Sequence, residues 1–359
     1  VFTPRNPAPQ RAVAPSSHLC QNSSDSSMPS DIPGRREASM KTVPTLTELM
    51  TYSPFLDAPR WKFVAMALYL PLGVALVVVR VVTTFVVTLF LFAAPASYAS
   101  AAGTVALNVL WVVFGGVLRV RCADGGTPAE ARARLRSARV IVSNHLSQAD
   151  SWPFRVLTPI ACVIRETYLG TSRWLPVAKL TTAAFDPIYV PTPGSRGEAE
   201  ERAARAATKA AVERHVRDAA SKPLLYFPEG SITNGRGLMR FSAFVFGLDV
   251  PVTPVAVSFW EPWPLALDTV WSPLHWNLLR MAYQPCHIVE LAVLPTLTAR
   301  AGEEPPAFAE RTATDLANEL GIAATPHTTE EKRAAMKKLK RAGQAKVLRE
   351  GPEAVLRAA

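Results

Sequence analysis

The segment VIVSNHLSQAD, residues 140–150, decides the fold class, because an apolar run passes directly into a polar turn. A short apolar run without alternation is typical of a strand that is buried on both faces of a sheet. Similar runs recur along the chain, and longer polar stretches separate them. The predicted strands are residues 138–144, 187–190, 223–230, 250–259 and 287–297. This order predicts an α/β fold with a mostly parallel central sheet flanked by helices.

Three polar stretches have the pattern of helices. Residues 197–220 begin with Glu and continue with Ala and Arg, an order of charges that complements the helix dipole. Residues 307–321 end at a glycine, which is a common helix stop. The basic segment 329–349 is the third predicted helix.

Residues 63–118 are mostly apolar and contain a single charged residue, Arg80. A bilayer core of about 30 Å requires about 20 apolar residues as a helix, so the stretch is long enough for two passes. A charge at mid-membrane is costly unless it snorkels or pairs, and this favours a shallow hairpin that dips into one leaflet. Two full spans and a pair of buried core helices are the alternatives.

Basic residues flank this apolar stretch on both sides, and they are Arg60, Lys62, Arg119 and Arg121. Positive residues tend to remain cytoplasmic, so we expect both ends of the hairpin on the cytosolic side. The chain then divides into four parts. These are a disordered extension (1–58), a membrane hairpin or two transmembrane helices (59–119), an α/β domain (120–300) and a helical basic tail (301–359). An organelle transit peptide is an alternative for the start, so whether residues 1–40 belong to the mature protein stays open.

The net charge of +10 suits an anionic partner, which can be a membrane surface, a phosphorylated substrate or nucleic acid. No pattern of a nucleic-acid recognition fold accompanies the charge, so we expect no nucleic-acid partner. The four cysteines are scattered without a CxxC pair. This spacing argues against a zinc site and against a disulfide framework.

His145 and Asp150 form the first candidate site. Residues five apart lie about 140° apart on one helix, so the pair can meet only if His145 occupies the turn after the strand and Asp150 begins a helix. The carboxylate can then bind one ring nitrogen, and the other nitrogen can take a proton from a hydroxyl. An ordinary polar turn is the alternative. His275 and His287 have no acidic residue at a useful spacing.

FPEGSITNGRG, residues 227–237, forms the second candidate site, again directly after a predicted strand. A glycine-rich turn with hydroxyls, backbone N–H groups and Arg suits a phosphate group. A simple strand-to-helix turn is the alternative.

NHLSQAD (144–150), FPEG (227–230) and PVTPVAV (251–257) together resemble the glycerolipid acyltransferases of the PlsC type, over residues 120–300. The resemblance implies transfer of a fatty acyl group from acyl-CoA to a hydroxyl of a lysophospholipid or of glycerol phosphate. His145 is then the general base and Asp150 its orienter, without a metal or prosthetic group. The implied substrate-binding residues are Asn144, Ser147, Arg196, Glu229, Gly230, Ser231, Thr233, Asn234 and Arg236.

The middle block of that family departs from the pattern here. The family carries an Arg soon after this strand as a ligand of the acceptor phosphate, whereas FDPIYVPTPGSRG has Pro191 near that place. Arg196 follows several residues later and is the candidate substitute, so the identity of the acceptor is open.

The apolar hairpin, TNGRGLMRFS (233–242) and ELGIAATPHTTEEKRAAMKK (319–338) resemble the ancient ubiquitous protein subfamily. The resemblance implies the endoplasmic reticulum or lipid droplets, with a hairpin in the membrane and both termini cytosolic. We expect no CUE domain in this chain, so the ubiquitin-linked role is not carried over. A non-catalytic lipid-droplet or membrane scaffold that retains the fold is the alternative function, although the intact His145, Asp150 and Glu229 favour an enzyme.

Overall fold

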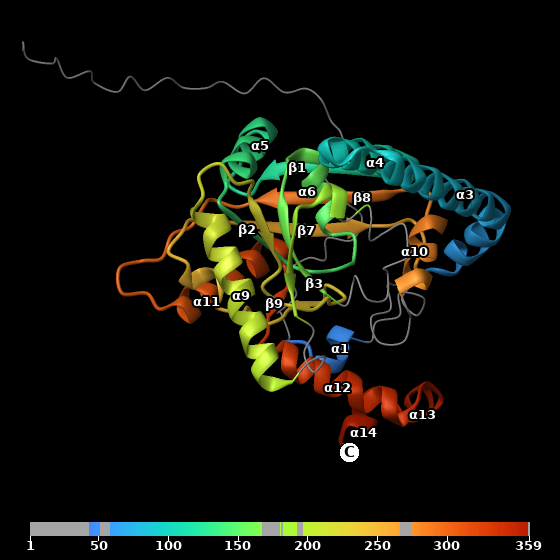
Figure 1. Ribbon diagram of the computed structural model, residues 1–359. Helices are drawn as coiled ribbons and strands as arrows, with labels where there is room; N and C mark the ends of the chain where they lie inside the picture. The colour runs from blue at the N-terminus through green and yellow to red at the C-terminus, as the bar shows by residue number, and fades with distance from the viewer. Residues whose placement is uncertain are drawn as a thin grey trace, which may run out of the picture. The chain divides into compact units, whose positions relative to one another are not determined.

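The predicted strands lie side by side in one sheet (Figure 1). The computed structural model describes residues 43–50, 58–166, 180, 182–191, 197–265 and 274–357. The described helices are α1 Leu46–Met50, α3 Arg60–Ala93, η1 Ala96–Tyr98, α4 Ala99–Val113, α5 Pro128–Ser137, α6 Ser151–Leu157, α9 Glu198–Arg217, η2 Val245–Gly247, α10 Leu274–Tyr283, α11 Pro305–Leu320, α12 Thr329–Ala342, α13 Gln344–Glu350 and α14 Pro352–Arg357. The described strands are β1 Gly116–Cys122, β2 Val140–Ser143, β3 Ala161–Arg165, β4 Pro187–Val190, β5 Leu224–Tyr226, β6 Gly237–Leu238, β7 Val252–Trp260, β8 His287–Val293 and β9 Ala323–Ala324.

The central sheet has seven strands in the order β1-β8-β7-β2-β5-β3-β4. All neighbours are parallel except β7 and β8, which run antiparallel. The structure therefore confirms the predicted α/β class with a mostly parallel sheet. Two of its strands were not predicted: β1 lies where the apolar hairpin was expected to end, and β3 follows a helix of only seven residues.

The register between β2 and β5 brings the two candidate sites together. Val140 is paired with Leu224, so equivalent positions on these parallel strands are 84 residues apart. His145 and Glu229, which follow the two strands, have the same separation. Because the carboxyl ends of parallel neighbours meet at one edge of a sheet, the turns that follow β2 and β5 lie side by side.

Helices cover both faces of the sheet. Ile141 faces a core that it shares with α4, α5 and α6, whereas its neighbours Val140 and Val142 face a second core that contains residues of α9 and α11. This alternation along β2 follows from the period of two in a strand. The result is a layer of helices on each side of the sheet (Figure 1).

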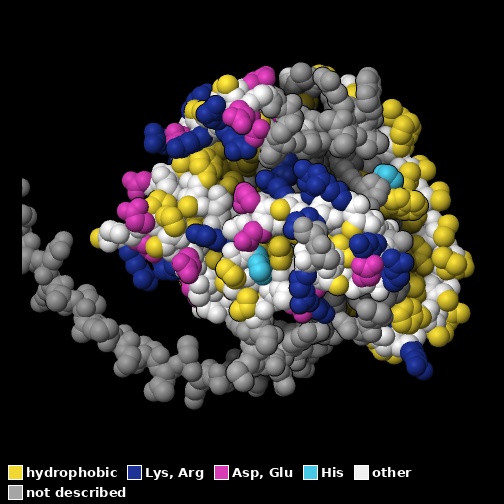
Figure 2. Space-filling model, turned by 90° about the horizontal axis from the view of Figure 1, so that it is seen from below, with side chains coloured by type: hydrophobic (Ala, Val, Ile, Leu, Met, Phe, Trp, Pro, Cys, Tyr) yellow, Lys and Arg dark blue, Asp and Glu magenta, His cyan; other side chains and the backbone are white. Residues whose placement is uncertain are grey.

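The first arm of the apolar hairpin is the long helix α3, whose 34 residues extend for about 51 Å. It is the one described helix that is long and apolar enough to cross a membrane, by length and composition. Much of its apolar surface is exposed, including Leu68, Val79 and Phe92. Figure 2 shows hydrophobic side chains gathered along the right-hand edge, on the side where Figure 1 places α3.

The second arm, α4, differs from the predicted second span. Its 15 residues extend for about 22 Å, which is short for a bilayer core of about 30 Å. One face is buried in the α/β core through Ala102, Ala106 and Leu107. Gly103 lies so close to the backbone of Ala183 that a Cβ would meet its carbonyl at 2.5 Å. The hairpin thus has one apolar arm that is largely exposed and one arm that packs on the domain.

Arg80 is almost fully buried and binds four backbone carbonyls. Its guanidinium donates to Val113 O at 2.9 Å, to Ala282 O at 2.8 Å, to Pro285 O at 3.2 Å and to Gln284 O. These carbonyls lie at the C-terminal ends of α4 and α10, where no intrahelical donor remains and the helix dipole favours a cation. Arg80 therefore pairs, and it attaches the middle of α3 to the domain.

The C-terminal region does not begin as a separate tail. α11 packs on the sheet through Phe308, Ala313 and Leu316, so the α/β core continues past residue 300. The predicted helix 329–349 is divided into α12 and α13 at Gly343, where φ is 85°. α12, α13 and α14 share a small apolar cluster with α1, which lies in the part that was expected to be disordered.

Candidate active site

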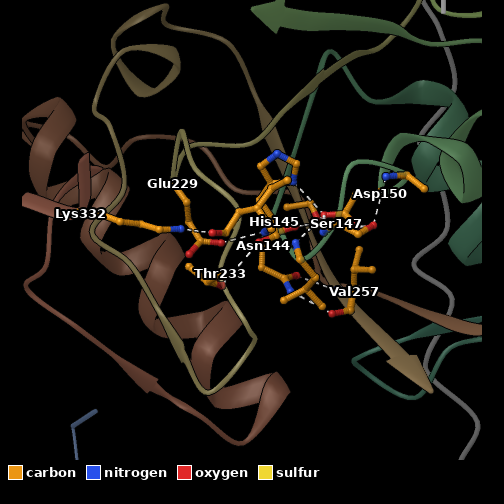
Figure 3. A network of polar contacts seen from close by, with 12 residues as sticks. Asn144, His145, Ser147, Asp150, Glu229, Thr233, Val257 and Lys332 are labelled. Carbon is orange, nitrogen blue, oxygen red and sulfur yellow. Dashed lines mark hydrogen bonds and ion pairs between the residues drawn. The ribbon is translucent and has the colours of Figure 1, made fainter. Parts of the chain in front are cut away.

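His145 and Asp150 lie together at the carboxyl edge of the sheet (Figure 3). His145 occupies the turn after β2, and Asp150 is the residue directly before α6. The distance between His145 Nδ1 and Asp150 Oδ2 is 2.8 Å. The sequence placed the two residues at these positions, and the structure joins them in a hydrogen bond.

Asp150 is held by donors that fix its orientation. The Oδ2 atom also accepts hydrogen bonds from the backbone N–H of Leu146 and, at 3.0 Å, of Ser147. The Oδ1 atom accepts from the Ser147 hydroxyl at 2.6 Å. Every partner is a donor, so Nδ1 of His145 must also carry a proton toward Oδ2. This leaves Nε2 as the acceptor nitrogen of the neutral ring.

The His145 ring borders a cavity of about 1330 Å³. Its side chain is 21% exposed, whereas that of Asp150 is fully buried. The ring stacks on Phe227 with a centroid distance of 4.3 Å and an interplanar angle of 14°. Phe227 comes from the turn after β5, so the second motif fixes the face of the imidazole while Asp150 fixes its edge.

Asn144 is buried and joins β2 to β7. Its Nδ2 donates to Val257 O at 2.9 Å, and its Oδ1 accepts from Val257 N–H at 2.8 Å. The side-chain amide therefore imitates a peptide group and continues the ladder between the two strands past the end of β2. It holds the start of the His145 turn, and both its polar atoms are engaged.

Glu229, which the family resemblance implied as a substrate ligand, is fully buried and binds the backbone. Its Oε1 accepts from His145 N–H at 2.8 Å, and its Oε2 accepts from Met239 N–H at 2.9 Å (Figure 3). Burial raises the pKa of Glu229 to about 8, while these two N–H groups and the charge of Lys332 act to lower it. Glu229 thereby connects the turn after β5 to the backbone of His145.

Of the other residues of the second motif, some border the cavity and others form hydrogen bonds within the surrounding structure. Gly230 and Ser231 border the cavity. The N–H of Thr233 donates to His145 O at 2.8 Å, and Thr233 is buried. Asn234 donates to Glu48 O of α1 at 2.5 Å, and the exposed Arg236 donates its N–H to Asn234 Oδ1 at 3.1 Å.

Gly230 has a conformation that explains its residue type. Its φ is +62°, a region that favours glycine. A Cβ at this position would also meet Thr329 Oγ1 at 3.3 Å. Both the turn and the close approach of α12 therefore require a glycine after Glu229.

Another strand brings an arginine close to the place where the family pattern has its Arg. Arg196 lies outside the described residues, and Pro191 is buried at the end of β4. Arg165, the last residue of β3, is in register with Val190, directly before Pro191. Its guanidinium donates to Gly230 O at 3.3 Å and borders the cavity. A cation thus lies beside the expected place, which the sequence could not indicate because β3 was not predicted.

Two further contacts could not be predicted from the sequence, one in the site and one away from it. Lys332 of α12 is 1% exposed, and its Nζ donates to Ile232 O. Burial lowers the pKa of Lys332 to about 8, and the charge of Glu229 acts to raise it. Away from the cavity, His287 has an acidic partner after all: its Nδ1 lies 2.8 Å from Glu261 Oε1. Lys332 and Ile232, like His287 and Glu261, are far apart in sequence, so only the fold brings each pair together.

A His–Asp pair at the carboxyl edge of a mostly parallel α/β sheet is an arrangement that suits general-base activation of a hydroxyl. Residues 129–258 match the family model described as Acyltransferase. This match covers the part of the chain that contains the His145–Asp150 pair and the turn after β5. In the described part, no group of three His, Cys, Asp or Glu could hold a metal ion.

Three curated proteins illustrate what the chain is similar to. It is 28% identical over 229 residues to the "lipid droplet-regulating VLDL assembly factor AUP1 homolog" of Caenorhabditis elegans (62% of this chain, 53% of the relative). It is 33% identical over 109 residues to the mouse "lysophospholipid acyltransferase LPCAT4" (28% and 20%), and 28% identical over 130 residues to the human "glycerol-3-phosphate acyltransferase 3" (35% and 29%). The chain spans about half the length of the AUP1 homologue.

Proposed function

We propose that the protein transfers a fatty acyl group from acyl-CoA to a hydroxyl of a lysophospholipid or of glycerol phosphate at a membrane face. The observation that carries the proposal is the 2.8 Å contact between His145 Nδ1 and Asp150 Oδ2, in a His145 residue that borders the cavity. The family match supports acyl transfer, and the names of two relatives support these acceptors.

Nε2 of His145 takes the proton of the acceptor hydroxyl as its oxygen attacks the thioester carbonyl carbon of acyl-CoA. The C–O bond forms, and the C–S bond breaks as the tetrahedral intermediate collapses. The thiolate of CoA then receives the proton from the imidazolium, which restores the neutral ring. Asp150 stabilises the imidazolium between the two proton transfers and holds the ring in one tautomer. No acyl-enzyme is formed.

The cavity suits substrates that combine an apolar chain with phosphate groups. Its lining includes the apolar side chains Trp152, Phe185 and Phe227, which can contact an acyl chain. It also includes Arg165 and Arg240, whose charges can bind the phosphates of the acceptor or of CoA. Within the proposal, no metal or prosthetic group takes part.

The apolar surface of α3 supports attachment to a membrane, where both lipid substrates reside. α1, which precedes α3 in sequence, contacts the loop that follows β5 through the bond from Asn234 to Glu48 O. The segments before and after the hairpin therefore pack on each other, which supports a hairpin that returns to the side it left. We propose the endoplasmic reticulum or lipid droplets as the location, with both flanks in the cytosol.

The test uses protein purified in detergent, radiolabelled acyl-CoA and a panel of acceptors. The panel contains lysophosphatidic acid, lysophosphatidylcholine, lysophosphatidylethanolamine and glycerol 3-phosphate. We expect transfer to at least one acceptor, its loss in His145→Ala, and its retention in His215→Ala, a histidine of α9 that does not border the cavity. Equal transfer by wild type and His145→Ala would refute the proposed role of the base. For the topology, cysteine labelling near Arg60 and Arg119 from opposite sides of the membrane would refute the hairpin.

A non-catalytic lipid-droplet or membrane scaffold is the second candidate function. The observation that favours it is the similarity to the AUP1 homologue, whose name describes an assembly factor. The scaffold predicts that lipid-droplet targeting is intact in His145→Ala and that no acceptor of the panel is acylated. The enzyme predicts transfer that depends on His145. The same panel therefore separates the two functions.

A further inference from the structure

The long helix α3 is docked on the domain along one face. Its buried residues are Gly73, Arg80, Thr88 and Leu91. At about 100° per residue, these positions form a single stripe along the helix, about 27 Å in length. Val82, on the opposite face, is exposed. The exposed apolar surface of α3 therefore runs alongside the domain, so an element that packs beside α3 faces the same surroundings.

The helix α10 lies directly beside α3 (Figure 1). The Tyr69 hydroxyl donates to Tyr283 O at 3.0 Å, and the Tyr283 hydroxyl donates to Met66 O at 3.4 Å. The two tyrosine rings meet edge to face, with their centroids 5.4 Å apart. A Cβ at Gly73 would overlap the Tyr283 ring, so a glycine permits this close approach. These contacts fix the end of α10 on α3.

The two sides of α10 have different surroundings. Asn277 and Met281 are buried, and Nε2 of His287 donates to Met281 O at 2.9 Å. Leu278 borders the candidate active-site cavity, whereas Trp276 is 55% exposed and does not border it. Positions two apart on a helix point about 200° apart. α10 therefore separates the cavity from the surface that carries Trp276.

The surface around Trp276 is apolar and adjoins α3. Among the described residues, the large apolar side chains that are exposed outside the hairpin are Val43, Val117 and Trp276. α10 contains no Asp or Glu, and the adjoining part of α3 has no charged residue between Lys62 and Arg80. A protein interface has a polar rim around its apolar centre, whereas this surface continues into the uncharged side of α3. Tryptophan is enriched at the lipid–water interface, so a lipid surface is the occupant that fits.

We propose that α10 is a second lipid-contacting element, with Trp276 inserted into the same lipid leaflet as α3. The contact rests on the membrane attachment that is proposed for α3. Within the proposed acyl transfer, it also gives α10 a role in access to the cavity. A lysophospholipid reaches the cavity past Leu278, directly from the lipid surface, because an acyl chain is costly to expose to water.

The first experiment needs no activity. The full chain is labelled with fluorotryptophan and placed in vesicles of phosphatidylcholine and phosphatidylserine, and the ¹⁹F signal of Trp276 is assigned by its absence in Trp276→Phe. Its line broadening is measured with doxyl-labelled phosphatidylcholine and with a water-soluble gadolinium chelate. The matched control is Lys209→Trp, at a position of α9 whose side chain is 63% exposed.

The two probes give opposite results for a lipid contact and for a solvated helix. We expect the lipid probe to broaden the Trp276 signal several-fold more than the gadolinium chelate does, and the opposite order at position 209. Stronger broadening of Trp276 by the gadolinium chelate would overturn the lipid contact. Protection of Trp276 from both probes would overturn it as well, because a second copy of the chain or another protein would then cover α10.

The second experiment measures acyl transfer by Trp276→Glu and by the control Lys209→Glu. One acceptor is a long-chain lysophospholipid in vesicles, and the other is a hexanoyl acceptor of the same head group dissolved in water. We expect Trp276→Glu to raise KM for the vesicle acceptor on the order of tenfold, because an acidic side chain is unfavourable in lipid. KM for the dissolved acceptor, and both values for Lys209→Glu, should stay near those of wild type. An equal rise for both acceptors, or no rise with either, would contradict access past α10.

The two experiments distinguish this inference from the proposed function. Absence of acyl transfer in wild type would refute the proposed function, and the ¹⁹F measurement would still test the lipid contact. Transfer by wild type, with Trp276 reached by the gadolinium chelate and not by the lipid probe, would refute the inference alone.

Discussion

Asp150→Asn tests the His–Asp pair without changing its shape. Oδ2 of Asp150 accepts from Leu146 N–H and Ser147 N–H as well as from His145. The asparagine must therefore place its oxygen at this position, since an NH₂ group there would face two N–H donors. Its NH₂ group then faces the Ser147 hydroxyl, which can turn and accept. The tautomer of His145 is preserved, and only the negative charge is lost.

The size of the effect follows from that charge. An imidazolium and a carboxylate about 4 Å apart, at an effective dielectric constant of about 20, attract each other by about 4 kcal/mol. The attraction exists only after the ring has taken the proton, so it stabilises the transition state and not the bound substrate. Since about 1.4 kcal/mol is a factor of ten, kcat should fall about 10³-fold, and KM should change little.

The assay is the initial rate of radiolabelled acyl transfer over a range of acceptor concentrations, with Ser147→Ala as the companion variant. Ser147→Ala removes one donor to Oδ1 but leaves the charge, so about a tenfold loss is expected from one hydrogen bond. A kcat for Asp150→Asn within tenfold of wild type would refute the pairing. So would a loss that lies entirely in KM.

Three further predictions concern stability. Arg80→Met leaves buried carbonyls at two helix ends without a donor and should lower the free energy of unfolding by about 3 kcal/mol. The control variant Arg119→Met, at an exposed position, should change it by less than about 0.5 kcal/mol. Thermal unfolding in detergent compares the two variants, and equal midpoints would contradict the attachment of α3 by Arg80. Asn144→Asp replaces the donor to Val257 O by a second acceptor and should cost about 3 kcal/mol in the same assay, so a wild-type midpoint would contradict the bridge. Burial raises the pKa of Glu229 from an ordinary 4.5 to about 8 in the folded chain. The folded state therefore binds more protons than the unfolded state between these pH values. The free energy of unfolding should accordingly fall as pH rises from about 4.5 to about 8. Glu229→Gln should remove this part of the slope, and an identical slope in both proteins would contradict the shift.

Local patterns in the sequence were sufficient to predict how His145 and Asp150 are arranged in the candidate site. β2 and β5 were predicted because each is a short apolar run that ends in a polar turn. The i, i+5 spacing excluded a single helix face, so His145 had to lie before the helix and Asp150 at its start. The structure has that arrangement, with a 2.8 Å contact between them. These features depend on neighbours in sequence, which a pattern can report.

The other features of the site and of the fold depend on residues that are close in space but distant in sequence. The family resemblance implied that Glu229 holds the substrate; in the structure its carboxyl binds the backbone of His145, because the register of β5 against β2 brings the two turns together. In the sequence, Lys332 is one of several lysines of a basic helix. Its bond to Ile232 O exists only because α12 packs on the turn after β5. The apolar run of α4 has the composition of a membrane segment, but its small residues pack against the domain.

The central claim is that His145 removes the proton from an acceptor hydroxyl. The most direct measurement is the rate at which CoA thiol is released from acyl-CoA by purified protein, with and without a lysophospholipid, in wild type and in His145→Ala. We predict release that depends on the acceptor and matches the acyl lipid formed, and a loss of more than about 10³-fold in His145→Ala. Release that is the same in both proteins, or that does not depend on the acceptor, would contradict the account.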